Sequence, residues 1–303
     1  MAFATIGSRS LAGQAPSAKA APAEKAWTGA RTADGQPDLQ GTWENFDTTP
    51  FERPEPRPQN APRGGGGGVA IGPPGFWSEA GKNAPRPSMV VDPPTGRVPV
   101  MAWAEAKREY NTAHIGDSWE NQTPWERCIT RGAPGGLFPA AYNNAYQIVQ
   151  GPGYVVILQE MIHEARVIPV DGSPHLPATI RLWAGDARGH WEGNTLVVDI
   201  TNYNDKGSIA TSGATGRIRG IPQSEDLHVV ERFTRVSEKT ISYEVTISDP
   251  KVYAAPWKVA MPLNRNDDYQ IFEYACHEGN NAMPDTLSGG RAQDKADAAK
   301  TVK

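Results

Sequence analysis

The sequence has no long apolar run and no excess of charge of one sign, and each absence argues against a class of protein. No stretch of about 18 apolar residues, the length of a membrane-spanning helix, occurs in the 303 residues. Lys and Arg number 30 against 34 Asp and Glu, a formal net charge of −4, which argues against a nucleic-acid binder. Hydrophobic residues make up only 38%, and 31 Gly with 27 Pro argue against a helical bundle.

Cofactor and metal signatures are also missing. Neither G-x-x-x-x-G-K-[ST], G-x-G-x-x-G nor G-x-S-x-G occurs in a credible context, which disfavours nucleotide cofactors and α/β-hydrolase chemistry. The run Gly64 to Gly68 lacks the Lys-Ser/Thr of a phosphate loop. The 6 histidines show no i, i+4 or His-x-His spacing, so we predict no metal and no other cofactor, although ligands from distant strands remain an alternative.

The composition changes along the chain and predicts three parts. Residues 1–32 are interpreted as a leader, which consists of the remaining end of a truncated signal peptide and a disordered segment. The alternative is a leader without a targeting role. Residues 33–288 are predicted to form one β-rich domain with a flexible Gly-rich loop at 60–75. Residues 289–303 are predicted to be a disordered tail. The protein is therefore expected in the periplasm or outside the cell.

Two cysteines, Cys128 and Cys276, are too few for a zinc knuckle and wrongly spaced for a redox pair. In an exported chain we expect them to form a disulfide, with two unpaired buried thiols as the alternative. A bridge that closes so long a loop contributes about 4 to 5 kcal/mol in the chain-entropy model.

After Ala140 the sequence consists of short strands separated by turn signals. The clearest alternation is Thr240–Ser248, which pairs naturally with 227–236 through a short turn. Residues 101–113 contain no Gly or Pro and predict the only convincing helix. The fold class is thus mainly β: an antiparallel, barrel-like meander of eight to ten strands, lipocalin-like or a strongly curved sheet, with Pro/Gly-rich loops. The remaining strands are expected at 38–43, 146–150, 154–161, 166–170, 190–191, 195–201, 257–263 and 270–276.

Several long phrases carry a family resemblance. They are Trp-Glu-Arg-Cys-Ile-Thr-Arg-Gly (125–132), Tyr-Asn-Asn-Ala-Tyr-Gln-Ile (142–148), Gly-His-Trp-Glu-Gly-Asn-Thr-Leu-Val-Val (189–198) and Tyr-Ala-Cys-His-Glu-Gly-Asn (274–280). Over roughly residues 33–290 the chain resembles a large family of exported bacterial proteins without an assigned activity. The resemblance implies an exported β-rich domain and carries over no catalytic residue.

Three polar segments concentrate groups that could perform chemistry. In Gln159–Arg166, an unbent strand would place Glu160 and Glu164 on one face, about 13 Å apart at roughly 3.3 Å per residue. That distance is too long for a carboxylate pair, so an acid–base pair there needs a second strand. Solvated salt bridges are the alternative for this segment.

The segment Asp186–Asn194 gathers an acid, a base, an imidazole and an indole around a tight turn, although the turn alone also requires Asp, Gly and Asn. In Glu273–Glu278, strand alternation would put Glu273 and His277 on one face and Tyr274 on the other. A hydrogen-bonded structural histidine is the alternative at His277.

These segments predict an exported enzyme that performs cofactor-free acid–base chemistry, a lyase, isomerase or hydrolase, on a small sugar-like or aromatic molecule. The 9 tryptophans suit such ligands, although they could instead seal the barrel ends. The alternatives are a non-catalytic periplasmic carrier of lipocalin type and a cell-envelope interaction domain. The predicted site residues are catalytic His163, His277, Glu160, Glu192 and Tyr274 and substrate-binding Arg166, Arg188, Trp191, His190 and Asn144. The oligomeric state is left open.

Overall fold

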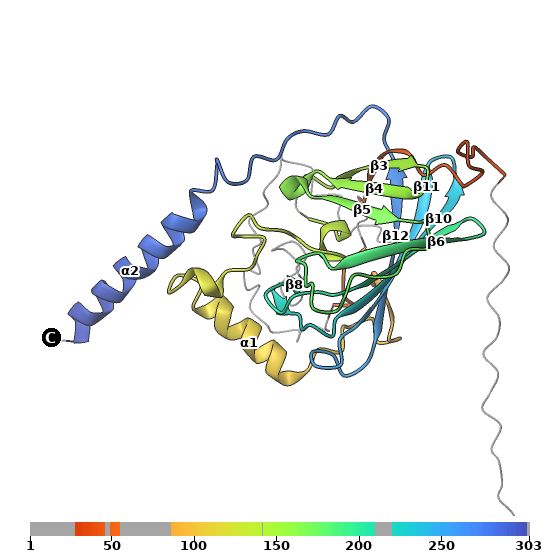
Figure 1. Cartoon of the computed structure of the whole chain (residues 1–303). Coiled ribbons are helices and arrows are strands. Elements are labelled where there is room, and N and C mark those ends of the chain that lie inside the picture. Colours follow the sequence, from red (N-terminus) through yellow and green to blue (C-terminus); the bar gives the residue numbers. More distant parts are fainter. Residues whose placement is uncertain (1–27, 46–48, 55–85, 141, 210–219, 302–303) are drawn as a thin grey trace, which may run out of the picture.

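The described part of the chain forms a nearly closed, barrel-like antiparallel sheet with two α-helices outside it (Figure 1). This computed structural model describes residues 28–45, 49–54, 86–140, 142–209 and 220–301. The predicted leader up to residue 27 and the Gly-rich loop at 60–75 lie outside the described residues. No described helix combines the length and the hydrophobicity that crossing a bilayer requires.

The sheet has ten strands, and neighbours along the chain are mostly neighbours in the sheet. In sheet order the strands are β5 (Ala165–Pro169), β4 (Tyr154–Gln159), β3 (Ala145–Gly151), β1 (Gly41–Glu44), β12 (Trp257–Arg265), β11 (Thr240–Ser248), β10 (His228–Ser237), β7 (Thr195–Thr201) and β6 (Asp186–Glu192), and β2 (Val90–Asp92) pairs with β12. The other elements are the β8 (Ser208–Ile209) and β9 (Ile221–Pro222) pair, α1 (Ala102–Ala113), α2 (Ala282–Thr301) and three short 3₁₀ helices, η1 (Trp119–Asn121), η2 (Gly135–Leu137) and η3 (Met161–His163). The predicted fold class is confirmed.

Side-chain alternation decides which face of each strand points inward. In β11 the residues Ile241, Tyr243, Val245 and Ile247 are fully buried, and the residues between them are partly exposed. Large side chains from the other strands, such as Phe233, fill the remaining interior. The barrel interior is therefore a packed core in the described part of the chain.

The two ends of the sheet meet where β5 lies beside β6. Gly189 of β6 faces this seam, and a Cβ there would lie 2.7 Å from Val170 Cγ1 and 2.9 Å from Ile168 Cγ2. Such distances leave no room for a side chain. Gly189 therefore allows Val170 and Ile168 to pack directly against its backbone, which closes the seam.

A buried ion pair crosses the interior from one side of the seam to the other. Arg166 Nη2 of β5 lies 2.9 Å from Glu231 Oε2 of β10, and both side chains are at most 4% exposed. The Tyr243 hydroxyl donates a 2.8 Å hydrogen bond to Glu231 Oε1. Burial by itself lowers the pKa of Arg166, but the Glu231 carboxylate outweighs burial and raises it. Arg166 thus links β5 to β10 across the interior of the barrel.

Three local expectations differ from the structure. Residues 270–276 are not a strand. Both edges of the preceding strand β12 are already paired, with β1 and β11, so the segment that follows β12 has no open edge of that strand to pair with. The strand after Gln159 does not continue unbent: the chain turns at η3, where Ile162 has φ +62°.

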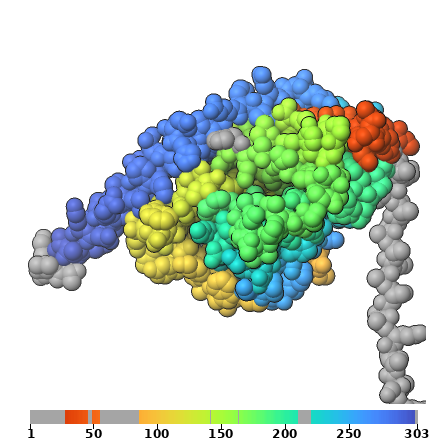
Figure 2. All heavy atoms as spheres, in the orientation of Figure 1, coloured from red at the N-terminus to blue at the C-terminus, as the bar shows by residue number. Residues whose placement is uncertain are grey.

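The predicted disordered tail contains most of a second helix, α2, which runs through Gly289 and Gly290. A Cβ on Gly290 would lie 2.5 Å from the Gly116 carbonyl oxygen. Gly290 therefore allows close packing against the loop after α1, and the Ala-rich residues that follow favour helix. Figure 2 shows α2 projecting from the barrel body.

The predicted disulfide is present between Cys128 and Cys276, whose Cα atoms are 5.6 Å apart and whose sequence separation is 148. It fastens the segment that follows β12 to the middle of the chain. Since residues 270–276 have no strand partner, the bridge adds a second covalent link, besides the backbone from β12, between them and the rest of the domain.

Reduction of this disulfide is expected to lower the free energy of unfolding by about 3 to 5 kcal/mol, because the unfolded chain regains the entropy of a long loop. Urea unfolding with and without dithiothreitol measures the change. The Cys128→Ser/Cys276→Ser double variant is the control and should not respond to the reductant. Equal midpoints for the oxidised and reduced protein would contradict the prediction.

Replacing Glu231 with Gln is expected to lower the free energy of unfolding by about 3 to 5 kcal/mol, because it leaves the Arg166 charge buried without a counter-charge. Glu244→Gln is the matched control on β11, where Glu244 lies 3.9 Å from Lys258 at the surface; it should cost less than about 1 kcal/mol. Urea unfolding of both variants tests this. Equal losses in the two variants would show that the buried pair has no special role.

Candidate functional site

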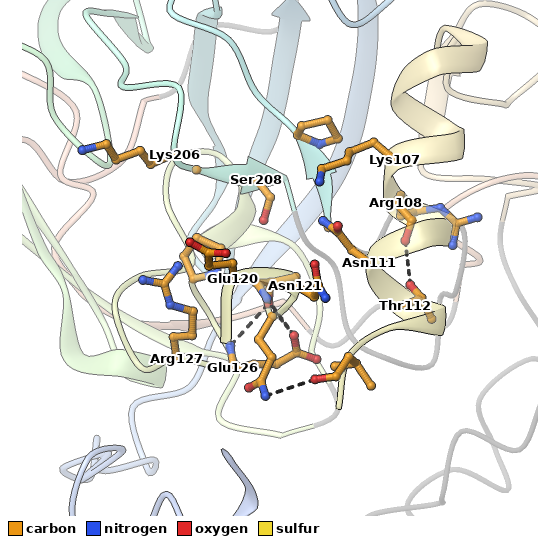
Figure 3. A pocket seen from close by; sticks show the side chains of 17 residues that line it. Lys107, Arg108, Asn111, Thr112, Glu120, Asn121, Glu126, Arg127, Lys206 and Ser208 are labelled. Atoms are coloured by element: carbon orange, nitrogen blue, oxygen red, sulfur yellow. Dashed lines mark hydrogen bonds between the residues drawn. The ribbon is translucent and has the colours of Figure 1, made fainter. Parts of the chain in front are cut away.

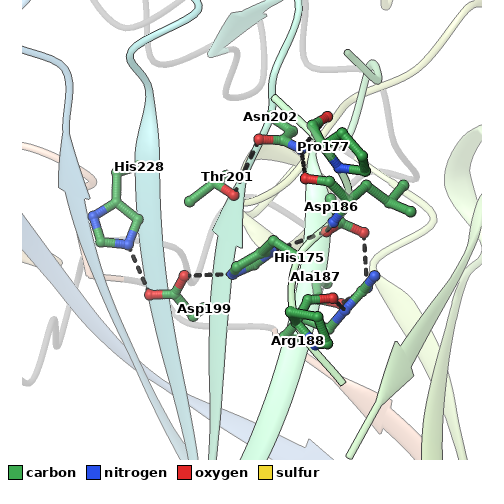
Figure 4. A network of polar contacts seen from close by, with 11 residues as sticks. His175, Pro177, Asp186, Ala187, Arg188, Asp199, Thr201, Asn202 and His228 are labelled. Atoms are coloured by element: carbon green, nitrogen blue, oxygen red, sulfur yellow. Dashed lines mark hydrogen bonds and ion pairs between the residues drawn. The ribbon is translucent and has the colours of Figure 1, made fainter. Parts of the chain in front are cut away.

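The outer face of β6, β7 and β10 carries a continuous chain of charged and imidazole groups (Figure 4). His175 lies between two carboxylates, with Nδ1 2.9 Å from Asp186 Oδ2 and Nε2 2.9 Å from Asp199 Oδ1. The second oxygen of Asp199, Oδ2, lies 2.7 Å from His228 Nε2. Asp199 therefore joins two histidines that are 53 positions apart in the sequence.

Strand alternation places these groups on the outside. Asp199 lies between Val198 and Ile200, which are both fully buried, so its own side chain points away from the core. His228 precedes the fully buried Val229 and faces outward for the same reason. His175 comes from the segment between β5 and β6, which folds over this face.

A buried carboxylate, Asp186, anchors one end of this network of polar groups. Asp186 is 5% exposed, accepts a 2.7 Å hydrogen bond from Arg188 Nη1 and accepts a 2.9 Å bond from the Leu176 backbone N–H. Both ring nitrogens of His175 face carboxylate oxygens, and both contacts are hydrogen bonds at once only when the ring carries two N–H groups. The anchor fixes the orientation of His175 and, through it, of Asp199.

Electrostatics favour an ionised Asp199. Burial by itself raises the pKa of this carboxyl, but the hydrogen bonds from His228 and His175 and their charges outweigh burial and lower it. His228 is 46% exposed, and within the described residues its Nδ1 atom makes no hydrogen bond to protein. An imidazole held by a carboxylate at one nitrogen and open at the other is the arrangement of a general base.

The structure brings three predicted residues of the β6 to β7 hairpin to this same outer face. Arg188 holds Asp186, and Glu192 contacts both Arg232 Nη2, at 2.8 Å, and His190 Nε2, at 3.2 Å. Hydrogen bonds from Arg232 and then His190 lower the pKa of Glu192. The fourth, Trp191, instead packs against the core.

The sequence analysis missed His175, Asp199 and His228. The signal for Asp199 was available: a single carboxylate interrupts the apolar run from Leu196 to Ile200, where alternation alone puts it on the face opposite the core. Its two histidine partners could not be found in this way, because only strand pairing and a loop bring them to it.

Other predicted residues lie in a second cluster near the disulfide. The Glu160 carboxylate is 1% exposed and accepts hydrogen bonds from the Tyr269 hydroxyl, at 2.8 Å, and the Phe272 N–H, at 3.3 Å. The Tyr274 hydroxyl lies 3.0 Å from that of Tyr142, and burial, with this hydrogen bond, raises the pKa of Tyr274. Both residues are thus held in place, and Tyr274 packs beside Met161 and Ile162 of η3.

The remaining predicted residues are distributed around this cluster. Asn144 is buried, and its amide closes a loop by accepting from the Ala140 N–H and donating to the Ala140 carbonyl. His277 is exposed in a turn. The backbone of His163 belongs to η3, but its side chain lies outside the described residues.

Arg131 is a further residue of this cluster that the sequence analysis missed. Its side chain is buried, donates to the Phe138 carbonyl at 3.1 Å and lies 4.8 Å from the centre of the Trp125 ring. Burial lowers its pKa, against the influence of nearby tyrosines. No carboxylate pairs with it among the described residues.

The described residues contain no group of three or more His, Cys, Asp or Glu arranged to hold a metal ion. Comparison of the chain with protein-family models, with curated proteins and with solved structures gave no significant match. The site must therefore be interpreted from its own geometry.

The lowered pKa of Asp199 predicts a pH-dependent contribution to stability. A carboxyl whose pKa is depressed on folding stabilises the protein above its unfolded value of about 3.9 and loses this contribution as the pH falls through the folded value. Urea unfolding of the wild type and Asp199→Asn is therefore expected to differ most near pH 5 and progressively less towards about pH 2. A difference that stays constant across this range would contradict the assignment.

Proposed function

We propose that this protein is an exported enzyme that performs cofactor-free acid–base chemistry on a small sugar-like or aromatic molecule. The observation that carries the proposal is Asp199, whose two oxygens bind the imidazoles of His175 and His228 at 2.9 and 2.7 Å. His228 is the proton acceptor, Asp199 is its partner, and His175, Asp186 and Arg188 are positioning residues.

The chemistry follows from the open nitrogen of His228. With Asp199 accepting from Nε2–H, the lone pair on Nδ1 takes a proton from a C–H or O–H group of the substrate. The Asp199 carboxylate stabilises the imidazolium that forms. Return of the same proton to another atom of the substrate gives an isomerisation, and its transfer to a leaving group gives an elimination. In a hydrolysis, Nδ1 instead takes the proton from an attacking water and passes it to the leaving group. The geometry fits all three reaction types.

The surroundings of His228 and Asp199 suit a substrate with both polar and apolar parts. Arg232 and Arg188 provide guanidinium groups on the same outer face. The segment that covers this face exposes Leu176, Ile180 and Leu182 by 37 to 43%. Because Arg188 and Arg232 are each paired with a carboxylate, Asp186 and Glu192, the face offers hydrogen-bonding groups beside exposed aliphatic side chains, which suits a ligand with polar and apolar parts.

Export is proposed from the disulfide together with the expected leader. Disulfides persist in oxidising compartments such as the periplasm and the extracellular space. Cys128 and Cys276 are bonded, and the described residues contain no free cysteine. This agrees with the exported family that the chain resembles.

A carrier of lipocalin type is the less favoured alternative. Such a protein needs an apolar cavity inside the barrel. The described interior is occupied by large side chains such as Phe233 and Tyr243 and by the Arg166–Glu231 ion pair. The interaction-domain alternative rests on the Pro-rich N-terminal third, most of which lies outside the described residues.

The test begins with a thermal-shift screen against sugars and aromatic acids, followed by NMR of each stabilising compound to detect conversion. For the converted compound, His228→Gln and Asp199→Asn are each expected to lower kcat by about 10²- to 10⁴-fold, because each removes the general base or its partner.

His114→Gln is the matched control, since His114 is also an exposed imidazole that contacts a carboxylate, Asp117 at 2.6 Å, but it lies directly after α1 and does not contact Asp199. It should keep turnover within about twofold of the wild type. Full turnover in both His228→Gln and Asp199→Asn would overturn the proposal, as would the absence of conversion for every stabilising compound.

A further inference from the structure

A polar cavity separate from the His–Asp network lies between α1 and the β8–β9 pair (Figure 3). Its volume is about 120 Å³. Since one water needs roughly 10 to 15 Å³ of such volume, the cavity has room for about ten non-hydrogen atoms, and a slightly larger ligand extends through its open side into solvent.

One face of α1 forms a wall of this cavity. Lys107 and Asn111 are four residues apart on the helix, as are Arg108 and Thr112, so α1 presents a single polar stripe. Ile115 lies in the turn that follows the helix. The opposite wall is Gly207 and Ser208, and the segment from Glu120 to Arg127 closes the cavity between them.

Two buried polar atoms in this cavity have no hydrogen-bond partner within the described part of the chain. They are Asn111 Oδ1 and Ser208 Oγ, which come from opposite walls. Figure 3 shows the two side chains across from each other, with Lys107 beside Asn111. Buried polar groups are costly without a partner, so the pair indicates a place for a molecule that supplies hydrogen bonds.

The charge of the lining selects the class of molecule. Lys107, Arg108, Arg127 and Lys206 outnumber Glu120 and Glu126. The acceptor Asn111 Oδ1 requires a donor from the ligand, which a bare inorganic anion such as sulfate does not provide. A ligand that carries both a carboxylate and hydroxyl groups satisfies the cationic lining and the two buried atoms together.

We infer that this cavity binds a small hydroxylated carboxylate, the chemistry of a sugar acid. Lys107 pairs with the carboxylate, a ligand hydroxyl donates to Asn111 Oδ1, and Ser208 Oγ exchanges a hydrogen bond with a second hydroxyl. Arg127 is held by stacking 4.5 Å from the centre of the Trp119 ring and keeps its charge at the rim.

Isothermal titration calorimetry of the full chain with D-gluconate tests the inference, with D-glucose and sulfate as comparison probes. Gluconate is expected to bind more tightly than either, because glucose lacks the carboxylate and sulfate lacks donors. Lys107→Gln and Ser208→Ala should each weaken gluconate binding by about tenfold.

Lys239→Gln is the matched control, because Lys239 lies in the turn between β10 and β11, outside the cavity lining. It should leave gluconate affinity unchanged, and the thermal midpoint of each variant shows that it is folded. Absence of gluconate binding, equal binding of gluconate and sulfate, or unchanged affinity in both folded Lys107→Gln and Ser208→Ala would each overturn the inference. None of these outcomes depends on the activity of His228.

Discussion

Closure of the sheet at the seam between β5 and β6 is the constraint on which the rest of the structure depends. An antiparallel sheet of this length exposes two edges unless its ends approach each other. Here Ile168 and Val170 pack onto the bare backbone of Gly189, and Arg166 reaches across the interior to Glu231. A buried charge without its partner is strongly destabilising, so β5 must lie where Arg166 reaches Glu231. The position of the seam and the packing of the interior are therefore linked.

This closure also explains where polar chemistry can occur. Because the interior is filled, the groups open to solvent lie on the outer face of the strands and in the connecting segments. The segment between β5 and β6 runs over the outer face and delivers His175 to Asp199. The same seam that completes the core thereby places a loop on the β7 surface, where a carboxylate and two imidazoles meet.

Local patterns predicted much of this arrangement. Hairpins such as β6–β7 and β10–β11 follow from alternation and turn residues, and Cys128 with Cys276 is the single pairing that two cysteines allow. The errors arose where local pattern and tertiary context disagree. Residues 270–276 have strand-like composition, but both edges of the preceding strand β12 are already paired. The predicted disordered tail contains most of α2, where Gly290 packs closely against Gly116.

The sequence by itself determined the class of fold, the faces of the strands and the disulfide, because periodicity, turn residues and cysteine number act over short distances or allow a single pairing. Only the tertiary structure decided which polar residues act together. His175, Asp199 and His228 lie on three different segments, and each alone has the pattern of a surface residue. Their hydrogen bonds exist because strand register and a crossing loop bring them within 3 Å, and register is set by which face of each strand is buried in the assembled core.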